Sequence, residues 1–198
     1  MITINIRKYI QILITLSLIL AVVYVFYDYN KRATEKNEFK DSLSSEQVYD
    51  EDMNPISYGM NVGEMIYNFD FVDFETNETH NISEFFGQKI YLFFWSSWCP
   101  HCKNAAIELQ KLQEENHDIK IIGINLADTE FDNEGPLQFI EDIGITYMNG
   151  QAEDEMYELF QIESTPTSLF INSNGIIELG VVGGLTGDMI LNEFDKFD

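Results

Sequence analysis

The chain has 198 residues and a formal net charge of −23 at pH 7, with 34 acidic side chains against 11 lysines and arginines. This acidity makes nucleic acid and anionic lipid headgroups poor partners, so we predict no nucleic-acid partner. The length and the hydrophobic fraction of 45% suit one globular domain with an appendage. Only two cysteines are present, which excludes a framework of several disulfides.

The appendage lies at the N-terminus. Residues 9–27 form an uncharged apolar run that is long enough to cross a bilayer as a helix. Arg7 and Lys8 precede it, and the bulky residues 22–27 lack the small side chains of a signal-peptide cleavage site. We therefore predict an uncleaved transmembrane anchor over residues 9–27, with a cytoplasmic N-terminus at residues 1–8. Basic residues flank both ends of the run, so their distribution leaves the orientation open.

A polar stretch separates the anchor from the rest of the chain. Residues 28–61 mix both charges and show little apolar periodicity, apart from a possible helical turn near residues 35–40. This composition is typical of a linker. We predict a linker over 28–61 and a folded domain over 62–198.

The first half of this domain combines strand and helix patterns. Residues 89–95 are continuously apolar, as in a strand buried on both faces. Apolar residues recur at three- and four-residue spacing over residues 102–116, which predicts an amphipathic helix. Before these elements we predict a strand at 69–74, a return strand at 80–82 and a helical turn at 83–87.

The second half continues the alternation and ends in a hairpin and a helix. We predict strands at 119–126, 145–148, 167–171 and 176–182, a hairpin turn at 174–175, and helices at 136–143, 153–160 and 186–197. Thr186 is placed to cap the last helix. The order of elements predicts an α/β sandwich with a mixed central sheet and helices on both faces.

The two cysteines, Cys99 and Cys102, stand three positions apart where the first apolar strand meets the helix. Such a pair forms a reversible redox couple, in which one thiolate attacks a disulfide and the second thiol resolves the mixed disulfide. Because the first turn of a helix stabilises negative charge, we expect the pKa of the Cys99 thiol to fall below its usual value. We also expect Cys99 to be exposed and Cys102 to be more covered.

The two residues between the cysteines are candidates for tuning this couple. Pro100 lacks a backbone N–H, which has no cost at the first turn of a helix. His101 can donate a hydrogen bond or place positive charge near the Cys99 sulfur. Because a stabilised thiolate stabilises the reduced form, His101 would make the disulfide a stronger oxidant.

These residues resemble a known family. The run from Phe94 to Lys103 reads F-W-x-x-W-C-P-H-C-K, and Ser164-Thr165-Pro166-Thr167 follows some sixty residues later. Both motifs, in this order, resemble the thioredoxin superfamily over residues 62–198. With the N-terminal anchor and the early strand pair, the chain most resembles the TlpA/ResA-like group of membrane-anchored extracytoplasmic thiol–disulfide oxidoreductases.

The resemblance implies a thioredoxin-like fold and a role for each site residue. Cys99 would be the nucleophile and Cys102 the resolving thiol. Pro166 would be a cis-proline lying across from the dithiol, with Thr165 offering main-chain hydrogen bonds to an extended substrate and Trp98 flanking the dithiol. The implied chemistry needs no cofactor, and we predict no metal ligands.

The chain departs from the family pattern near the cysteines. Thioredoxins carry a buried acid where Phe93 stands, ResA-like proteins carry a glutamate where Ala105 stands, and the usual helix proline is replaced by Ile107. The dipeptide Pro100-His101 is instead that of the strongly oxidising DsbA proteins. We therefore favour oxidation or isomerisation of substrates over reduction.

The predicted partners are cysteine-containing exported proteins, together with a membrane or extracytoplasmic redox partner. The catalytic domain is expected outside the cytoplasm, where a tethered dithiol has its clearest use. Two alternatives stay open. One is a thioredoxin-like reductant for apocytochrome c or other exported proteins. The other is a copper-binding accessory protein that uses the same thiolates, which suit Cu(I).

Overall fold

The computed structural model describes residues 6–43, 48–49, 55–115, 117–152 and 160–197. The contacts within the chain divide it into two units, Met1–Ser42 and Leu43–Asp198. The first unit holds the N-terminal helix, and the second holds the sheet and the remaining helices.

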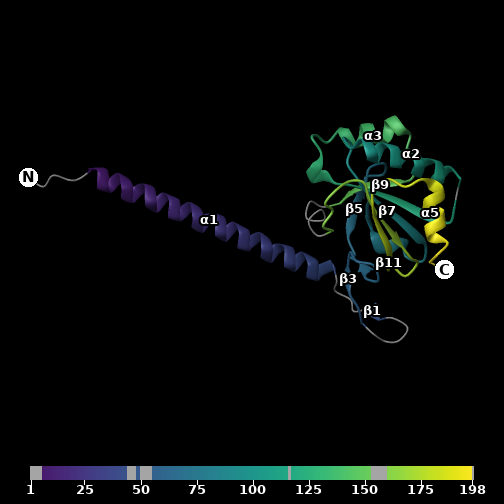
Figure 1. Cartoon of the computed structure of the whole chain (residues 1–198), viewed down its shortest axis with the longest axis horizontal. Helices are drawn as coiled ribbons and strands as arrows, with labels where there is room; N and C mark the ends of the chain where they lie inside the picture. The colour runs from purple at the N-terminus through teal and green to yellow at the C-terminus, as the bar shows by residue number, and fades with distance from the viewer. Residues whose placement is uncertain (1–5, 44–47, 50–54, 116, 153–159, 198) are drawn as a thin grey trace, which may run out of the picture. The chain divides into compact units, whose positions relative to one another are not determined.

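The described part of the first unit belongs to one continuous helix, α1 (Ile6–Leu43) (Figure 1). Its segment Ile12–Thr34 is long and apolar enough to cross a membrane, and it overlaps the predicted anchor at 9–27. The apolar side chains of this segment are exposed in the helix itself. A contiguous apolar surface of this kind is unfavourable in water, so the helix fits a single-pass membrane anchor.

The helix extends well beyond the apolar run, whereas only a possible helical turn near residues 35–40 was expected there. Residues 31–43 belong to α1, so the first part of the predicted linker is helical. This segment contains three lysines, two glutamates and one arginine, which favour helix. An Arg32–Asp28 ion pair of 3.0 Å joins adjacent turns. The strand β3 (Tyr58–Gly59) begins before residue 62 and pairs with β4 (Met65–Ile66).

The second unit is built on a seven-stranded mixed sheet, with a separate pair formed by β1 (Val48–Tyr49) and β2 (Pro55–Ile56). In spatial order the strands of the large sheet are β11 (Ile177–Val182), β10 (Thr167–Ile171), β7 (Lys89–Trp95), β8 (Ile119–Asn125), β9 (Met148–Ala152), β5 (Asp70–Asp73) and β6 (Thr79–Asn81). The β7–β8 and β8–β9 pairs are parallel, and the other pairs are antiparallel. The predicted mixed sheet is therefore confirmed.

The two central parallel strands carry the core. In β7 every residue from Ile90 to Trp95 is buried, and in β8 every residue from Ile121 to Asn125 is buried. Continuous burial on both faces explains why these strands read as unbroken apolar runs. Phe71 and Asp73 of β5 are buried while Asp70 and Val72 are exposed, the alternation of a strand with one buried face, within the strand predicted at 69–74.

Three helices pack against one face of the sheet (Figure 1). They are α2 (Pro100–Glu114), α3 (Gly135–Ile143) and α5 (Gly187–Phe194), and their apolar side chains share a core with Tyr91, Phe93 and Trp95 of β7. On the opposite face Phe94 packs against Phe160, which also contacts Phe69. The helix predicted at 153–160 lies outside the described residues, except for its last position.

The strand predicted at 145–148 is misplaced, because β9 begins at Met148. The backbone before Met148 has other hydrogen-bond partners than a strand. The Ile145 N–H donates to the Ile140 carbonyl, and the Thr146 N–H donates to the side chain of Gln110. The polar run Asn149-Gly150-Gln151 forms the strand because β8 and β5 pair with it on both sides. Tertiary pairing here overrides low intrinsic β-propensity.

The remaining helix boundaries differ little from those expected. Helix α2 begins at Pro100 and ends at Glu114, two residues earlier at each end than predicted. Helix α5 ends at Phe194 rather than at Phe197, and Thr186 caps it by accepting a hydrogen bond from the Met189 N–H. The predicted hairpin turn contains Gly175 at φ +82°, a conformation that favours glycine.

Candidate active site

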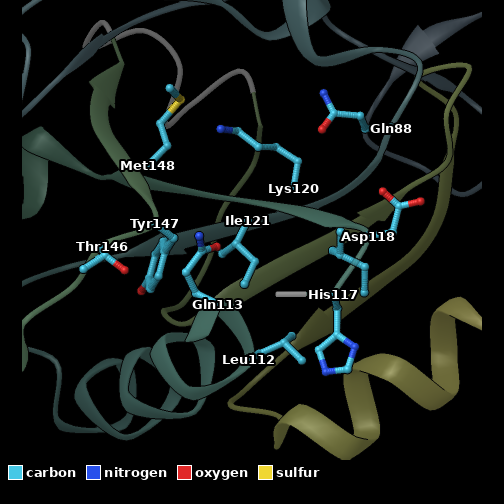
Figure 2. A pocket seen from close by; sticks show the side chains of 11 residues that line it. Gln88, Leu112, Gln113, His117, Asp118, Lys120, Ile121, Thr146, Tyr147 and Met148 are labelled. Atoms are coloured by element: carbon cyan, nitrogen blue, oxygen red, sulfur yellow. The ribbon is translucent and has the colours of Figure 1, made fainter. Parts of the chain in front are cut away.

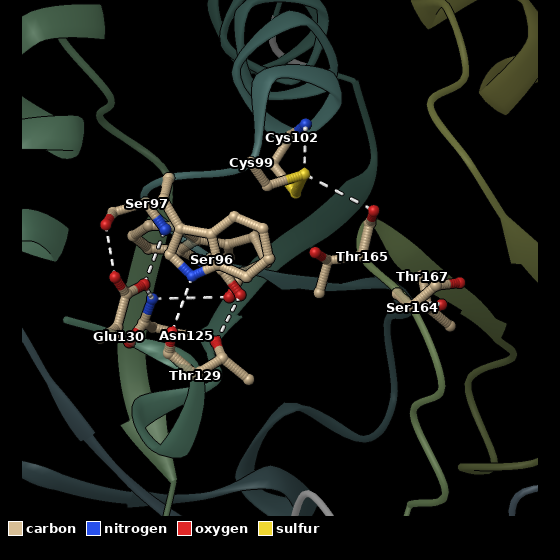
Figure 3. Close-up of a disulfide and its surroundings, with 12 residues drawn as sticks. Ser96, Ser97, Cys99, Cys102, Asn125, Thr129, Glu130, Ser164, Thr165 and Thr167 are labelled. Atoms are coloured by element: carbon tan, nitrogen blue, oxygen red, sulfur yellow. Dashed lines mark hydrogen bonds between the residues drawn. A yellow bond between two sulfur atoms is a disulfide. The ribbon is translucent and has the colours of Figure 1, made fainter.

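Cys99 and Cys102 form a disulfide at the first turn of α2, directly after the loop that leaves β7 (Figure 3). Their Cα atoms are 5.2 Å apart. Cys99 is the N-cap residue of the helix, and its Sγ atom accepts a hydrogen bond of 3.2 Å from the Cys102 N–H. This N–H group belongs to the first helical turn and has no acceptor within the helix, so it is free to bond the sulfur. In the reduced protein the same bond would favour a thiolate.

The two sulfur-bearing residues differ in exposure less than expected. Cys99 is 5% exposed and Cys102 is completely buried, so the prediction of an exposed Cys99 is wrong for this oxidised form. The disulfide holds Cys99 against α2, and the Thr165 loop lies against its other side. The direction of the difference is nevertheless as predicted, because only Cys99 offers any surface to a partner.

The loop before β10 faces the dithiol. The Thr165–Pro166 peptide bond is cis, as the resemblance implies. The Thr165 carbonyl oxygen lies 3.5 Å from Cys99 Sγ, where it can accept a hydrogen bond from the reduced thiol. Pro166 is buried, its carbonyl accepts from the Gly183 N–H at 2.8 Å, and Thr165 is half-buried. The structure thus brings this loop together with the cysteines from 66 residues away in sequence.

The other predicted site residues lie around the same helix start. Trp98 is half exposed, and its indole N–H donates to the Thr129 carbonyl at 2.7 Å. Pro100 and His101 are exposed. The imidazole of His101 makes no hydrogen bond or ion pair within the described part of the chain, so its tuning role stays a prediction.

The positions where related proteins carry an acid are apolar here, and both are buried. Phe93 and Ala105 pack in the core shared by the two cysteines. Two phenols belong to the same core, but burial raises the pKa of Tyr91 to about 12 and also raises the pKa of Tyr147. Both phenols therefore stay protonated near neutral pH and are poor proton acceptors for a thiol.

Sequence reasoning missed three residues beside the dithiol, all in or after the short helix η2 (Ala127–Thr129). Thr129 and Glu130 bind the residues that precede Cys99, and Phe131 is 86% exposed with its ring 6.1 Å from that of Trp98. A signal was available. The loops that follow neighbouring parallel strands meet at one edge of a sheet, so the segment after β8 had to lie near the segment after β7.

A cavity of about 310 Å³ lies at the other end of these strands (Figure 2). Gln88, His117, Asp118 and Lys120 contribute its polar lining, and all four lie at or just before the starts of β7 and β8. The cavity lies at the start of β7 and the dithiol follows the end of β7. The rise of about 3.3 Å per strand residue from Lys89 to Trp95 separates them by roughly 20 Å. The cavity is therefore separate from the thiol chemistry.

Comparison with known proteins agrees with this geometry. The model of the AhpC/TSA family matches residues 62–179, which is more than half of the chain. The chain belongs to the AhpC/TSA family. The matched range contains both cysteines, the Thr165-Pro166 loop and the segment after β8.

Similar proteins carry names from thiol–disulfide chemistry. Sporulation thiol-disulfide oxidoreductase A of Bacillus subtilis is 29% identical over 107 residues, covering 52% of this chain and 65% of that protein. Thiol-disulfide oxidoreductase ResA of Oceanobacillus iheyensis is 33% identical over 119 residues, covering 57% of this chain and 58% of that protein. The chain therefore spans less than two thirds of the length of these relatives.

Solved structures support the fold assignment. The crystal structure of StoA from Bacillus subtilis superposes with a TM-score of 0.56 at 27% identity, covering 63% of this chain and 94% of that chain. A DsbE-type interchange protein from Chlorobium tepidum gives a TM-score of 0.59 at 20% identity, covering 70% of this chain and 97% of that chain. The predicted thioredoxin-like fold and the resemblance to the ResA-like group are confirmed.

Proposed function

We propose that this protein is a membrane-anchored thiol–disulfide oxidoreductase that exchanges disulfides with cysteine-containing exported proteins. One observation carries the proposal. Cys99 Sγ accepts a hydrogen bond from the Cys102 N–H at 3.2 Å and lies 3.5 Å from the Thr165 carbonyl oxygen, so the sulfur of the less buried cysteine lies between a thiolate-stabilising group and a main-chain acceptor. The names of the AhpC/TSA relatives support the same chemistry.

The exchange has two steps at this site. In substrate oxidation, a substrate thiolate attacks Cys99 Sγ, the Cys99–Cys102 bond breaks, and Cys102 leaves as a thiolate that takes up a proton. A second substrate thiolate then attacks the substrate sulfur of the mixed disulfide, and Cys99 leaves as a thiolate. The substrate loses two electrons and two protons; the cysteine pair gains both electrons and the proton on Cys102, and the other proton goes to solvent. Reduction of a substrate runs through the same steps in reverse.

We favour the oxidising or isomerising direction. The Cys102 N–H that bonds Cys99 Sγ would stabilise the thiolate, and hence the reduced form of this protein, and the same effect is expected of His101. Phe93 and Ala105 stand where carboxylates assist reductases of this group. The competing direction is a reductant for apocytochrome c or other exported proteins. Equilibration with glutathione separates them: a potential near −270 mV, about that of thioredoxin, would contradict oxidation, and one nearer about −120 mV would support it.

The proposed location is the extracytoplasmic face of the membrane, with α1 as the anchor. A dithiol that must be reoxidised or rereduced also needs a redox partner in the membrane or outside it. The copper-binding alternative gains no support from the described residues, in which no group of three or more His, Cys, Asp or Glu side chains could hold a metal ion. A Cu(I) site on the two thiolates alone can be tested by titrating the reduced protein with Cu(I). Tight binding of one ion per protein, with no disulfide-exchange activity, would support that site.

Trapping tests the proposal directly. In Cys102→Ser the Cys99 thiolate can still attack a substrate disulfide, but the thiol that would resolve the mixed disulfide is missing, so substrates should accumulate on Cys99 as adducts that dithiothreitol releases. Cys99→Ser is the matched control, because it keeps the buried Cys102 thiol but removes the attacking sulfur. Equal adduct formation by the two variants, or none by either in intact membranes, would contradict the proposed activity.

A further inference from the structure

Every residue between β7 and Cys99 is tied to one dipeptide, Thr129-Glu130, at the end of η2 (Figure 3). The Ser96 hydroxyl contacts the Thr129 hydroxyl at 2.6 Å, and the Trp98 indole N–H donates to the Thr129 carbonyl. Because the Thr129 hydroxyl donates its one proton to the Leu126 carbonyl at 2.7 Å, Ser96 must donate to Thr129. The direction of the contact is therefore determined.

Glu130 makes the strongest part of this connection. One carboxylate oxygen accepts the Ser97 N–H at 2.6 Å, and the other accepts the Ser97 hydroxyl. The first oxygen also accepts from the buried side-chain amide of Asn125 at 2.6 Å. Hydrogen bonds to an ionised group are shorter and stronger than neutral ones, so a single half-buried carboxylate links the end of β8 to the loop two residues before the nucleophile.

The location of this carboxylate matters for the chemistry. The helix start stabilises a Cys99 thiolate only while the Cys102 N–H points at the sulfur, and that requires Cys99 to keep its extended N-cap conformation at φ −84° and ψ 112°. The loop 96–98 sets the entry of Cys99 into α2, and its backbone at Ser97 is held by Glu130. A carboxylate that acts as a general base would face the Cys99 sulfur. Both Glu130 oxygens instead accept hydrogen bonds from Ser97 and Asn125, which suits a structural role.

We propose that Glu130 is a positioning residue for thiol–disulfide exchange, which holds the Ser97 segment so that Cys99 Sγ stays at the first turn of α2. The inference rests on the proposed function for its biological use. Its chemical content, however, concerns only the dithiol of this chain and is measured without a physiological substrate.

The test compares two neutral substitutions in the full chain in detergent. Glu130→Gln keeps an oxygen for Ser97 N–H and Asn125 and offers an amide to the Ser97 hydroxyl, whereas Glu130→Ala removes all three bonds. Both remove the charge, so their difference isolates the positioning. In a Cys102→Ser background, the iodoacetamide alkylation rate of Cys99 between about pH 4 and 9 reports its thiol pKa.

We expect the Cys99 pKa in Glu130→Ala to lie about half a unit or more above that in Glu130→Gln, because the sulfur loses its place at the helix start. With both cysteines present, Glu130→Ala should keep its Cys99–Cys102 disulfide at a higher ratio of reduced to oxidised glutathione than Glu130→Gln does, because its reduced form is less stable. Glu130→Gln should stay close to the unsubstituted protein. Asp132→Asn is the charge control, because Asp132 lies two residues away and bonds only Glu134 and Gly135 N–H groups.

Equal Cys99 pKa values in the two neutral variants would overturn the proposal, as would a lower unfolding temperature of Glu130→Ala without a pKa difference. Ser97→Ala gives a milder version should Glu130→Ala fail to fold. It removes one bond to Glu130 and keeps the backbone one, so a smaller upward shift is expected and no shift counts against positioning. Failure of the trapping experiment with these pKa differences intact would contradict the proposed function alone.

Discussion

The surface beside Cys99 carries two aromatic rings that face solvent. Phe131 is the most exposed large apolar side chain of the described residues, and its ring contacts that of Trp98. The hydrogen bond from the Trp98 indole to Thr129 holds the second ring in place. Exposed aromatic residues next to a reactive sulfur are suited to bind apolar side chains of an approaching polypeptide.

We predict that Phe131→Ala lowers the rate of exchange with a polypeptide disulfide, such as insulin, about fivefold while leaving the rate with oxidised glutathione unchanged. The reason is that glutathione is too small to contact both rings. Met189→Ala in α5 is the matched control, since it also removes an exposed apolar side chain. A loss of equal size with both substrates would show that Phe131 acts on the dithiol itself rather than on binding.

At the scale of single elements, β8 depends on one glycine. A Cβ atom at Gly123 would lie 2.1 Å from the side-chain oxygen of Asn149 and 3.0 Å from the indole nitrogen of Trp95. Asn149 cannot withdraw freely, because it is buried and its amide donates to the Tyr147 carbonyl at 3.0 Å. The close approach of β9 to β8 therefore requires a residue without a side chain.

Gly123→Ala should lower the free energy of unfolding by about 1–3 kcal/mol through overpacking, as measured by guanidinium denaturation. Gly180→Ala in β11 provides the comparison. Its new methyl group would meet only Leu169 at 3.5 Å, at an exposed position of an edge strand, so its effect should stay within about 0.5 kcal/mol. Similar losses in both variants would indicate a general intolerance of strand glycines to substitution instead of a local clash.

At the scale of the whole molecule, the anchor decides which compartment the dithiol meets. The charged residues on the two sides of the apolar run do not select an orientation. Asn174 lies in an exposed turn of the sheet domain, away from the dithiol loops, and is suited to report the side of the membrane. A cysteine there can be labelled independently once the two native thiols are removed.

We predict that Asn174→Cys, in a chain that also carries Cys99→Ser and Cys102→Ser, reacts with a membrane-impermeant maleimide in intact cells. Labelling is expected because the proposed function places the domain outside the cytoplasm. Cells opened by detergent give the full extent of reaction, and the double serine variant without the new cysteine gives the background. Protection in intact cells followed by labelling in opened cells would reverse the proposed orientation.

The central strands and the helix that carries Cys99 were predictable because their signals are local. Continuous apolar runs mark β7 and β8, and three- to four-residue spacing marks α2, whatever surrounds them. The strand β9 was misplaced because its polar residues become a strand only between two partners. Most of the continuation of α1 beyond the apolar run was assigned to a linker because its residues are polar, although several of them favour helix.

The sequence by itself determined the dithiol and its place at a helix start, since both are written in adjacent residues, and the resemblance implied the cis-proline opposite it. Only the tertiary structure decided what holds and surrounds that dithiol. Thr129, Glu130 and Phe131 reach the site because β7 and β8 are parallel neighbours, so that the loops after them meet at one edge of the sheet. Contacts between residues 33 positions apart depend on which strands pair, and the local pattern of either segment does not show that pairing.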